Sequence, residues 1–283
     1  NLIGVKIASE KINKLKAKQM PISNEEVALF KENLPFKLTN AQERTIKEIS
    51  DDISLTKPMR RLVQGDVGSG KTVVAAVSMY ISAKNNTQSV LLCPTEVLAE
   101  QHFKNFSAWF KNSKIKIELL TGKMPVSKRR GIYQDLEDGV IDILIGTHAV
   151  FQDKVKMKNL GLVVVDEQQR FGVKQRFDLV KKSSDQIMPH QLFMTATPIP
   201  RTLAMTIFAD LETSKIDELP PGRKPVETLV YSDKKKDEIV KRLETVCKSG
   251  NQVFWLCTMI EESENLDVQA ADEAKEWIKE NTN

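Results

Sequence analysis

A short stretch near residue 65 has the residue types and spacing of a phosphate-binding loop. It follows the apolar pair Leu62-Val63 and runs Gly65-Asp66-Val67-Gly68-Ser69-Gly70-Lys71-Thr72. In this G-x-x-x-x-G-K-T pattern the glycines let backbone N–H groups surround a phosphate, and the following helix directs its positive dipole end at the same charge. We expect Lys71 to reach the β- and γ-phosphates and Thr72 to join a Mg²⁺ shell. The alternative is a glycine-rich turn that carries a lysine by chance.

An acidic pair closes another apolar run. Residues 162–165 are all leucine or valine, and Asp166 and Glu167 follow directly. An aspartate there can hold Mg²⁺ beside Thr72, and the glutamate can orient and deprotonate an attacking water. An Asp-Glu pair is also a common strand cap, so its meaning depends on the phosphate loop nearby. Together the two motifs predict a site that hydrolyses a nucleoside triphosphate.

Short apolar runs that alternate with helix-length intervals must position these motifs. The runs are 62–63, 90–93, 117–120, 141–145, 162–165 and 192–194, and an amphipathic helix is expected over 41–53. Runs of Val, Ile and Leu this short are typical of strands buried on both faces of a parallel sheet. The predicted fold is therefore α/β, a doubly wound parallel sheet with helices on both faces. In such sheets ligands bind at the carboxyl ends of the strands.

The chain divides into three parts by composition. Residues 1–33 are lysine-rich and predict a helical connecting segment, and residues 34–220 hold the alternating pattern. The proline-rich stretch 219–225 has the character of a linker. Beyond it, 221–283 predict the start of a second α/β lobe. Its expected strands are 226–231 and 252–257, and its expected helices are 237–248 and 270–279.

Composition excludes several classes of protein. The chain has 283 residues, of which 41% are hydrophobic and 28% charged, with a formal net charge of +4. This is a globular composition that is compatible with nucleic acid but does not require it. The cysteines Cys93, Cys247 and Cys257 are odd in number and form no C-x-x-C pair, which argues against a disulfide framework or structural zinc and favours the cytoplasm. No run is long enough to span a membrane, and a start without Met suggests a fragment.

Small hydroxyl residues and glycines follow the other apolar runs. They lie in four short stretches, 94–96, 121–123, 146–148 and 195–198. The candidate contact residues in these stretches are Thr95, Thr121, Gly122, Lys123, Thr147, His148, Thr195, Ala196 and Thr197. Short donors and backbone N–H groups suit sugar-phosphate oxygens, which carry no sequence information. Singly, each of these stretches is typical of an ordinary loop or helix cap. Taken in chain order, however, the series from the phosphate loop to Thr197 resembles the motifs of superfamily 2 helicases.

Longer motifs resemble one branch of that superfamily, the bacterial RecG helicases that act on branched DNA. They lie at 34–42, 166–173, 197–202 and 219–225, within a resemblance that covers 30–275. The resemblance implies a RecA-like fold, ATP with Mg²⁺, and replication forks and Holliday junctions as DNA partners in recombination and repair. It further implies a monomer associated with the nucleoid, with single-strand-binding protein as a further partner.

The resemblance also implies roles for individual residues. Phe36 and Gln42 would recognise adenine, and Thr95, Thr121, Gly122, Lys123, Thr147 and His148 would face DNA. The residues that would couple nucleotide state to DNA grip are Gln168, Gln169, Arg170, Thr195, Ala196 and Thr197. One departure concerns Gln169, where the family usually has histidine. Glutamine keeps a donor and an acceptor but cannot become cationic, which bears on coupling rather than on hydrolysis.

Two alternatives to this interpretation stay open. The transcription-repair coupling translocase shares much of 197–202, although Gln168 and the stretch 219–225 favour the RecG branch. A non-motor nucleotide-binding protein, such as a small-molecule kinase, would account for the phosphate loop but not for the other strand-end motifs. Hydrolysis in such motors needs an arginine from the second lobe, and the last arginine here is Arg242. We therefore expect this chain to bind ATP but to have little ATPase or helicase activity.

Overall fold

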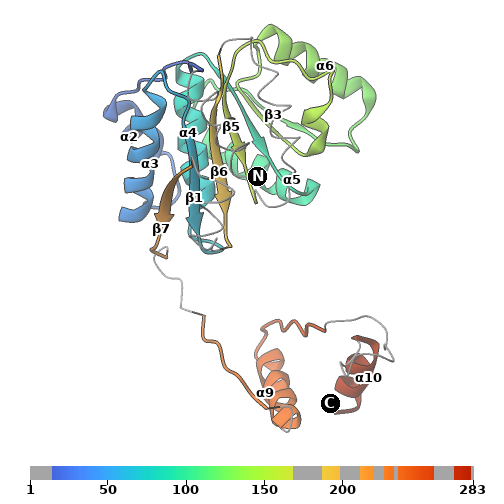
Figure 1. Ribbon diagram of the computed structural model, residues 1–283. Helices are drawn as coiled ribbons and strands as arrows, with labels where there is room; N and C mark the ends of the chain where they lie inside the picture. The colour runs from blue at the N-terminus through green and yellow to red at the C-terminus, as the bar shows by residue number, and fades with distance from the viewer. Residues whose placement is uncertain are drawn as a thin grey trace, which may run out of the picture. The chain divides into compact units, whose positions relative to one another are not determined.

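The computed structural model describes residues 15–167, 187–197, 211–219, 226–232, 235–257 and 271–281. The chain forms two compact units, which divide between Arg223 and Lys224. The first unit contains the phosphate loop and the sheet, and the described residues of the second unit form two helices (Figure 1).

A parallel sheet is the framework of the first unit. Its seven strands lie in the order β3-β4-β2-β5-β6-β1-β7, and every neighbouring pair is parallel. The strands are β1 (Arg60–Gly65), β2 (Gln88–Leu92), β3 (Ile117–Leu120), β4 (Ile143–Gly146), β5 (Leu160–Val165), β6 (His190–Thr195) and β7 (Glu212–Ile216). Each predicted apolar run forms a strand. The edge strand β7 was not predicted, because its sequence is mostly polar and mostly exposed.

Helices cover both faces of this sheet (Figure 1). They are α2 (Asn24–Glu32), α3 (Asn40–Ile53), α4 (Lys71–Lys84), α5 (Glu96–Trp109), α6 (Val126–Asp138) and the 3₁₀ helix η1 (His148–Phe151). Leu162 and Val164 of β5 pack in a core with α2 to α5, whereas Val163 and Val165 pack in another with α6 and η1. Successive strand residues point to opposite faces, so β5 is buried on both sides. The predicted doubly wound α/β fold is confirmed.

Helix α3 begins with a capping box. The Thr39 hydroxyl accepts the N–H of Gln42 at 3.3 Å, and the Gln42 side-chain oxygen accepts the N–H of Thr39 at 2.9 Å. Both donors belong to the group that a helix start leaves without an intrahelical acceptor. Ile46, Ile49 and Ile53 then form the buried face of the helix. The helix predicted over 41–53 is confirmed.

The segment before α2 is bonded to the end of α3. The Ala17 N–H donates to the Thr56 carbonyl at 2.7 Å, and the Met20 N–H donates to the Ile53 carbonyl at 2.9 Å. The side chains of Ala17 and Met20 are both buried. Ala17 and Met20 therefore belong to the core of the first unit.

The same segment is bonded to the start of β6 through His190. The imidazole accepts the N–H of Met59 at Nδ1, at 3.0 Å, and donates from Nε2 to the Lys18 carbonyl, at 2.9 Å. An isolated parallel bridge joins Lys16 to Ile187 beside it. Burial lowers the pKa of His190, because the charged ring would lose its hydration. The neutral ring thus links 16–20 to the amino ends of β1 and β6.

A buried cation joins α3, β1 and β7. The guanidinium of Arg61, with only 10% of its side chain exposed, lies 2.8 Å from Asp52 Oδ2 and 3.2 Å from Glu48 Oε2. It also donates to the Ser214 hydroxyl at 2.8 Å, and that hydroxyl donates to Glu48. Because Arg61 lies in β1, its two acidic partners in α3 and Ser214 in β7, the network holds the edge strand β7 against β1 and α3. Hydrogen-bonded buried charges of this kind are costly to leave unpaired.

The second unit contains α9 (Lys236–Lys248) and α10 (Ala271–Asn281), which confirms the helices predicted over 237–248 and 270–279. The strands predicted over 226–231 and 252–257 are wrong, since neither stretch forms a strand. A strand requires a ladder partner for its backbone groups, and the described residues supply none here. Val230 and Leu256 are accordingly 95% and 93% exposed.

Candidate nucleotide and nucleic-acid site

The strand order divides the carboxyl edge of the sheet into two halves. The ends of β1, β6 and β5 are neighbours, and they carry Gly65–Thr72, Thr195–Thr197 and Asp166–Glu167. We refer to this as the phosphate-loop half. The ends of β2, β4 and β3 form the distal half, which carries Thr95, Thr147–His148 and Thr121–Lys123. A single parallel sheet thus brings together motifs that are far apart in the sequence.

Left-handed glycines shape the phosphate loop. Gly68 has φ of 76° and Gly70 has φ of 89°, a region that side-chain-bearing residues rarely adopt. A Cβ on Gly70 would also lie 2.2 Å from Gln42 Nε2. The Ser69 N–H closes the turn on the Asp66 carbonyl at 3.0 Å, and α4 begins at Lys71. The backbone therefore curls into the first turn of a helix, as phosphate binding requires.

The Lys71 ammonium lies against its own loop. Its Nζ donates to the Gly65 carbonyl at 2.6 Å and to the Asp66 carbonyl at 3.0 Å. Partial burial lowers the pKa of Lys71, an effect that the nearby carboxylates of Glu167 and Asp166 oppose. A phosphate that binds the loop must therefore replace two carbonyl acceptors of this ammonium.

Gln42 is bonded to the phosphate loop, whereas Phe36 lies on the surface. The Gln42 amide donates from Nε2 to the Ser69 carbonyl at 2.7 Å, and the residue is only 3% exposed. Phe36 is 44% exposed, and its ring meets the ring of Trp109 edge-on at 5.8 Å. Adenine recognition by the two residues stays a prediction. The capping-box glutamine is in addition a direct support of the loop.

The acidic pair lies where it was expected, at the end of β5. The Asp166 N–H donates to the Leu92 carbonyl at 2.9 Å, and Asp166 is 9% exposed. Its Oδ2 lies 2.9 Å from Nε2 of His102 in α5. Glu167 has φ of 50°, a left-handed conformation that costs a residue with a side chain on the order of 1 kcal/mol. Such local strain is typical of functional sites.

These residues fit a magnesium-bound nucleotide. The Ser69 hydroxyl oxygen is buried without a hydrogen-bond partner among the described residues, inside a loop where Gly65 and Gly70 leave no room for a Cβ. No cluster of three or more His, Cys, Asp or Glu side chains that could hold a metal occurs in the part of the chain that the structure describes. Mg²⁺ commonly binds to one or two protein groups together with substrate phosphates. Thr72 and Asp166 are suited to that role.

The Thr195–Thr197 turn is bonded to β1. The hydroxyls of Thr195 and Thr197 are 2.9 Å apart, and the Thr197 N–H donates to the Thr195 hydroxyl at 3.2 Å. The Gln64 amide, one residue before the phosphate loop, donates to the Thr197 carbonyl at 3.4 Å. The turn is therefore in contact with the strand that carries the loop. The other predicted coupling residues, Gln168, Gln169 and Arg170, lie outside the described residues.

On the distal half, Glu96 joins two of the predicted DNA-facing motifs. Thr95 caps α5 by accepting the Leu98 N–H at 3.3 Å. The next residue, Glu96, accepts the Lys123 N–H at 3.3 Å and pairs with its ammonium at 3.0 Å. The pair lowers the pKa of Glu96 and raises that of Lys123, in each case chiefly through their hydrogen bond. The loop after β3 is thereby tied to the start of α5.

Exposure separates the remaining distal residues. Thr121 and Thr147 are buried, whereas Gly122, Lys123 and His148 are exposed. Contact with DNA stays a prediction for all of them.

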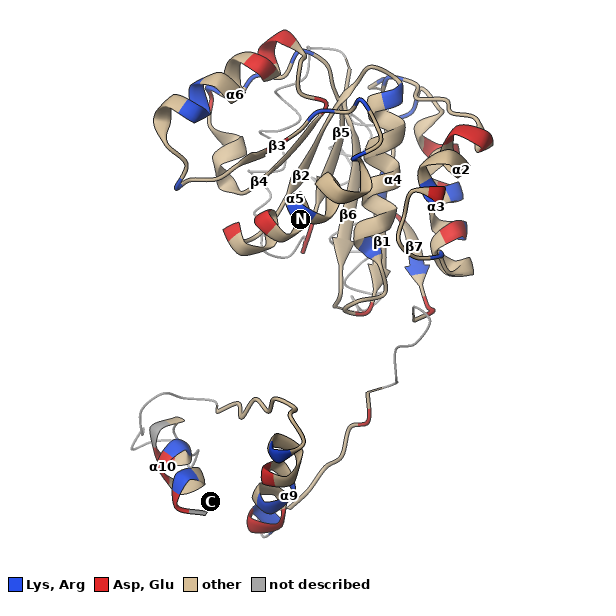
Figure 2. Cartoon of the chain, turned by 180° about the vertical axis from the view of Figure 1, so that it is seen from behind, with Lys and Arg blue, Asp and Glu red and all other residues tan. Residues whose placement is uncertain are grey.

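Helix α6, which follows Lys123, has its cations in the amino-terminal half and its acids in the carboxyl-terminal half (Figure 2). This distribution is the reverse of what the helix dipole favours, so the cations are not explained by helix stability.

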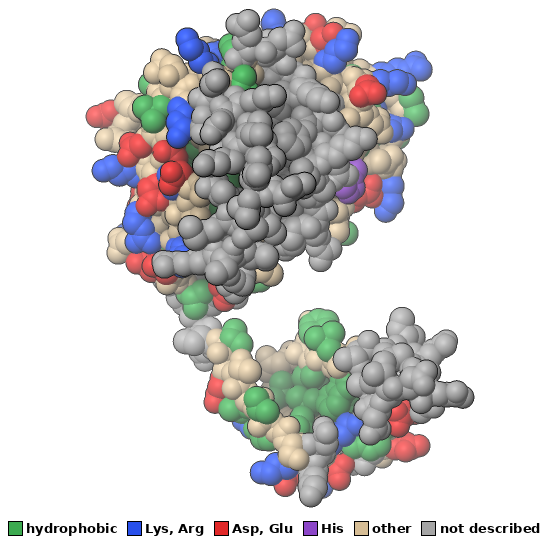
Figure 3. Space-filling view, in the orientation of Figure 1, with side chains coloured by type: hydrophobic (Ala, Val, Ile, Leu, Met, Phe, Trp, Pro, Cys, Tyr) green, Lys and Arg blue, Asp and Glu red, His purple; other side chains and the backbone are tan. Residues whose placement is uncertain are grey.

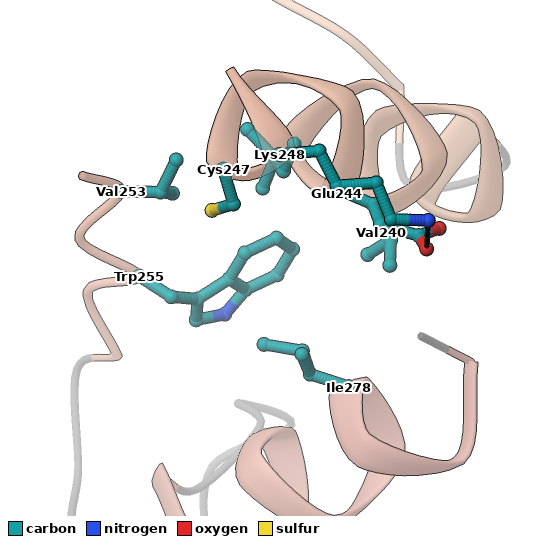
Figure 4. A pocket seen from close by; sticks show the side chains of 8 residues that line it. Val240, Glu244, Cys247, Lys248, Val253, Trp255 and Ile278 are labelled. Atoms are coloured by element: carbon teal, nitrogen blue, oxygen red, sulfur yellow. Dashed lines mark hydrogen bonds and ion pairs between the residues drawn. The ribbon is translucent and has the colours of Figure 1, made fainter. Parts of the chain in front are cut away.

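A hollow in the second unit carries no candidate residue. It has a volume of about 440 Å³, and Figure 3 shows hydrophobic side chains gathered around it. Its lining includes Val240, Cys247, Val253, Trp255 and Ile278 (Figure 4). The lining is mainly aliphatic and aromatic, so the hollow is a gap between apolar side chains of α9, α10 and 251–257.

Sequence reasoning missed several residues that support the site. His102 has no ligand-spaced partner in the sequence, and Glu96 was considered only as part of a strand-end loop. A helical period does identify one of them, because Ala99, His102 and Phe106 form the buried face of α5. A histidine on a face that packs against a sheet is a candidate for a buried polar contact. Its partner, however, is 64 residues away in the sequence.

The comparisons with known proteins agree with this geometry. The profile of the DEAD/DEAH box helicases matches residues 39–206, and the chain belongs to this family. Within it the chain is RecG-like. It is 48% identical over 274 residues to the ATP-dependent DNA helicase RecG of Aquifex aeolicus (strain VF5), covering 96% of this chain and 34% of that protein. It is 50% identical over 248 residues to RecG of Escherichia coli (strain K12), covering 87% and 36%.

A solved structure of RecG bound to a three-way DNA junction superposes with a TM-score of 0.81 at 35% identity, over 98% of this chain and 36% of that one. The fold is thus the RecA-like α/β fold of superfamily 2 helicases. The structure of the DUF1998 helicase MrfA bound to DNA is similar to this chain in fold only, with a TM-score of 0.59 at 17% identity. This chain spans about a third of the length of the RecG relatives, at 34% and 36%. No helix among its described residues is long and apolar enough to cross a membrane.

Proposed function

We propose that this chain is the motor segment of an ATP-dependent DNA helicase or translocase that remodels stalled replication forks and Holliday junctions in recombination and repair. The observation that carries the proposal is the phosphate loop and the acidic pair on one edge of a RecG-like sheet. The relative solved with a three-way DNA junction supports branched DNA as the substrate. ATP with Mg²⁺ is the cofactor that the family and the loop support.

The phosphate-loop half performs the chemistry in this proposal. The Lys71 ammonium leaves the carbonyls of Gly65 and Asp66 and binds the β- and γ-phosphate oxygens instead. The Thr72 hydroxyl and the Asp166 carboxylate would hold Mg²⁺, which when bound would neutralise charge on the phosphates. Glu167 accepts the proton of the attacking water. Bound ATP supplies the phosphoanhydride bond whose cleavage drives movement.

The distal half grips DNA in this proposal. Thr95, Thr121–Lys123 and Thr147–His148 approach the sugar-phosphate backbone, and contacts there carry no sequence information. Two further cations at the start of α6, Lys128 and Arg130, are exposed and belong to the same half. Backbone contact without sequence readout is what movement along DNA requires.

The domain assignment is part of the proposal. Residues 1–33 are a helical connecting segment, 34–220 are the first RecA-like lobe, and 221–283 are the start of the second. Hydrolysis then depends on an arginine from the second lobe, so the isolated chain turns over little ATP. We further propose a cytoplasmic, nucleoid-associated monomer with single-strand-binding protein as a further partner.

Calorimetric titration with Mg-ADP tests the proposed nucleotide site. We expect the chain to bind Mg-ADP, and Lys71→Ala to weaken binding by about 100-fold, because charge-assisted hydrogen bonds contribute about 1.5 to 3 kcal/mol each. A three-way DNA junction should bind more tightly than a linear duplex of the same length. If Lys71→Ala binds Mg-ADP as tightly as the parent chain does, the proposed nucleotide site is refuted. Equal affinity for junction and duplex would refute the branched-DNA substrate.

A further inference from the structure

A buried hydrogen bond connects α5 to the acidic pair. Nε2 of His102 lies 2.9 Å from Oδ2 of Asp166, and only 9% and 13% of the two side chains are exposed. A carboxylate oxygen is an acceptor, so the ring donates from Nε2. Nδ1 of His102 is buried without a hydrogen-bond partner among the described residues.

Both sides of this hydrogen bond are held in place. The His102 ring meets the ring of Phe106 edge-on, with centroids 6.5 Å apart, and Phe106 is fully buried. On the other side, the Asp166 N–H is bonded to the Leu92 carbonyl at the end of β2. The aspartate therefore sits between a strand that fixes its backbone and a helix that fixes one of its two oxygens.

We propose that His102 is a positioning residue for the magnesium site, because it fixes the rotation of the Asp166 carboxylate. With Oδ2 accepting the imidazole N–H, Oδ1 stays available to the metal shell. A carboxylate without this donor could rotate and lose part of its affinity for the ion. Outer-sphere partners of metal ligands typically contribute about 10- to 100-fold to metal affinity. The inference deepens the proposed function and rests on Asp166 being a magnesium ligand.

The position of His102 also connects the two halves of the sheet edge. The helix that carries it starts from Thr95, which belongs to the distal half. His102 is about two helical turns further along the same rigid element, at about 1.5 Å of rise per residue. One helix thus carries a predicted DNA contact at its start and the Asp166 donor on its buried face.

Two variants of the full chain separate positioning from packing. His102→Phe keeps an aromatic ring against Phe106 but removes the donor, whereas His102→Gln places an amide donor near the position of Nε2. The probe is ADP, titrated once with Mg²⁺ and once with EDTA, with electron paramagnetic resonance of Mn²⁺ bound with ADP as a second readout. Lys104→Ala, exposed on the same helix, is the matched control.

We expect His102→Phe to reduce the gain in ADP affinity that Mg²⁺ provides by about tenfold and to alter the Mn²⁺ spectrum. ADP binding in EDTA should not change, and His102→Gln should restore most of the gain. A magnesium gain in His102→Phe equal to that of the parent would overturn the inference. If His102→Phe folds poorly, His102→Ala is compared on the parent and Asp166→Ala backgrounds. It should reduce the magnesium gain on the first background and leave it unchanged on the second.

The two proposals fail in different ways. If the parent chain binds ADP without needing Lys71, the proposed nucleotide site fails. If binding needs Lys71 and gains from Mg²⁺ but His102 has no influence, only the positioning role fails.

Discussion

The two halves of the sheet edge are built by different means. The phosphate-loop half depends on left-handed glycines and on buried side chains that bond to backbone, such as Gln42 on Ser69. The distal half depends on a helix cap and on an exposed ion pair between Glu96 and Lys123. Buried polar contacts are costly to break, whereas exposed pairs contribute little. Substitutions on the first half should therefore have large effects on stability or nucleotide binding, and those on the second should act through salt-dependent DNA binding.

The largest effect is expected from the cation beneath the phosphate-loop half. Arg61→Ala leaves Glu48 and Asp52 without their buried partner, and we expect a loss of about 3 to 5 kcal/mol in the free energy of unfolding. Denaturant titration measures this loss. Arg44→Ala is the control, since the pair of Arg44 with Asp217 is exposed and should contribute little. If the two variants lose the same free energy of unfolding, burial does not make the Arg61 ion pairs more stabilising than the exposed Arg44 pair.

The next largest effect is expected in the phosphate loop itself. Gly70→Ala places a Cβ at a φ of 89° and within 2.2 Å of Gln42 Nε2. Strain of about 1 to 2 kcal/mol, together with a displaced buried amide worth a similar amount, should weaken Mg-ADP binding by about 100-fold. Calorimetry measures the affinity. Gly131→Ala in α6, where a Cβ meets nothing within 4 Å, should leave nucleotide binding as it is. Normal Mg-ADP binding by Gly70→Ala would contradict the steric argument.

An intermediate effect is expected on the distal half. Replacing Lys128 and Arg130 together by Glu should weaken DNA binding by about tenfold in low salt. The slope of log affinity against log salt concentration should fall by about one for each cation replaced. Fluorescence anisotropy with labelled duplex, measured at several salt concentrations, tests this. Mg-ADP affinity should not change. Lys47→Glu with Lys57→Glu makes the same charge change at exposed positions elsewhere, so an equal loss there would assign the effect to net charge.

The smallest effect concerns the strained glutamate. Glu167→Gly relieves the left-handed conformation at a φ of 50°, and glycine loses more entropy on folding than other residues. We expect the free energy of unfolding to rise by up to about 1 kcal/mol relative to Glu167→Ala, which keeps the Cβ. Denaturant titration of the two variants makes the comparison. A lower stability for the glycine variant would show that Glu167 is not strained.

Features that the sequence predicts well are local. The apolar runs identify the buried strands, because a strand covered on both faces needs apolar residues at every position. The phosphate loop is recognisable because its residues are contiguous. The edge strand β7 escaped prediction because it has one partner strand and mostly exposed side chains. Conversely, the apolar stretches 226–231 and 252–257 have the right composition for strands but lack the ladder partners that strands need.

The hydrogen bonds within the site that the sequence does not predict join residues far apart in the chain. The bonds from His102 to Asp166 and from Gln42 to Ser69 join residues 64 and 27 positions apart. Such pairs depend on how helices pack on the sheet, and a single sequence gives no measure of that packing. The types of residue in the site were therefore predictable, whereas the bonds that hold them were not.

The bonds that hold residues 16–20, the segment before α2, have a mechanical consequence. A pulling force on the backbone ahead of this segment would load the bonds of Ala17 and Met20 to the end of α3 and the bond of Lys18 to His190 together. The load would then enter the sheet at the amino end of β6. That end is opposite to the carboxyl edge, which carries the phosphate loop. The segment would then act as an anchored tether, and a single-molecule handle attached ahead of it would load the amino edge of the sheet first.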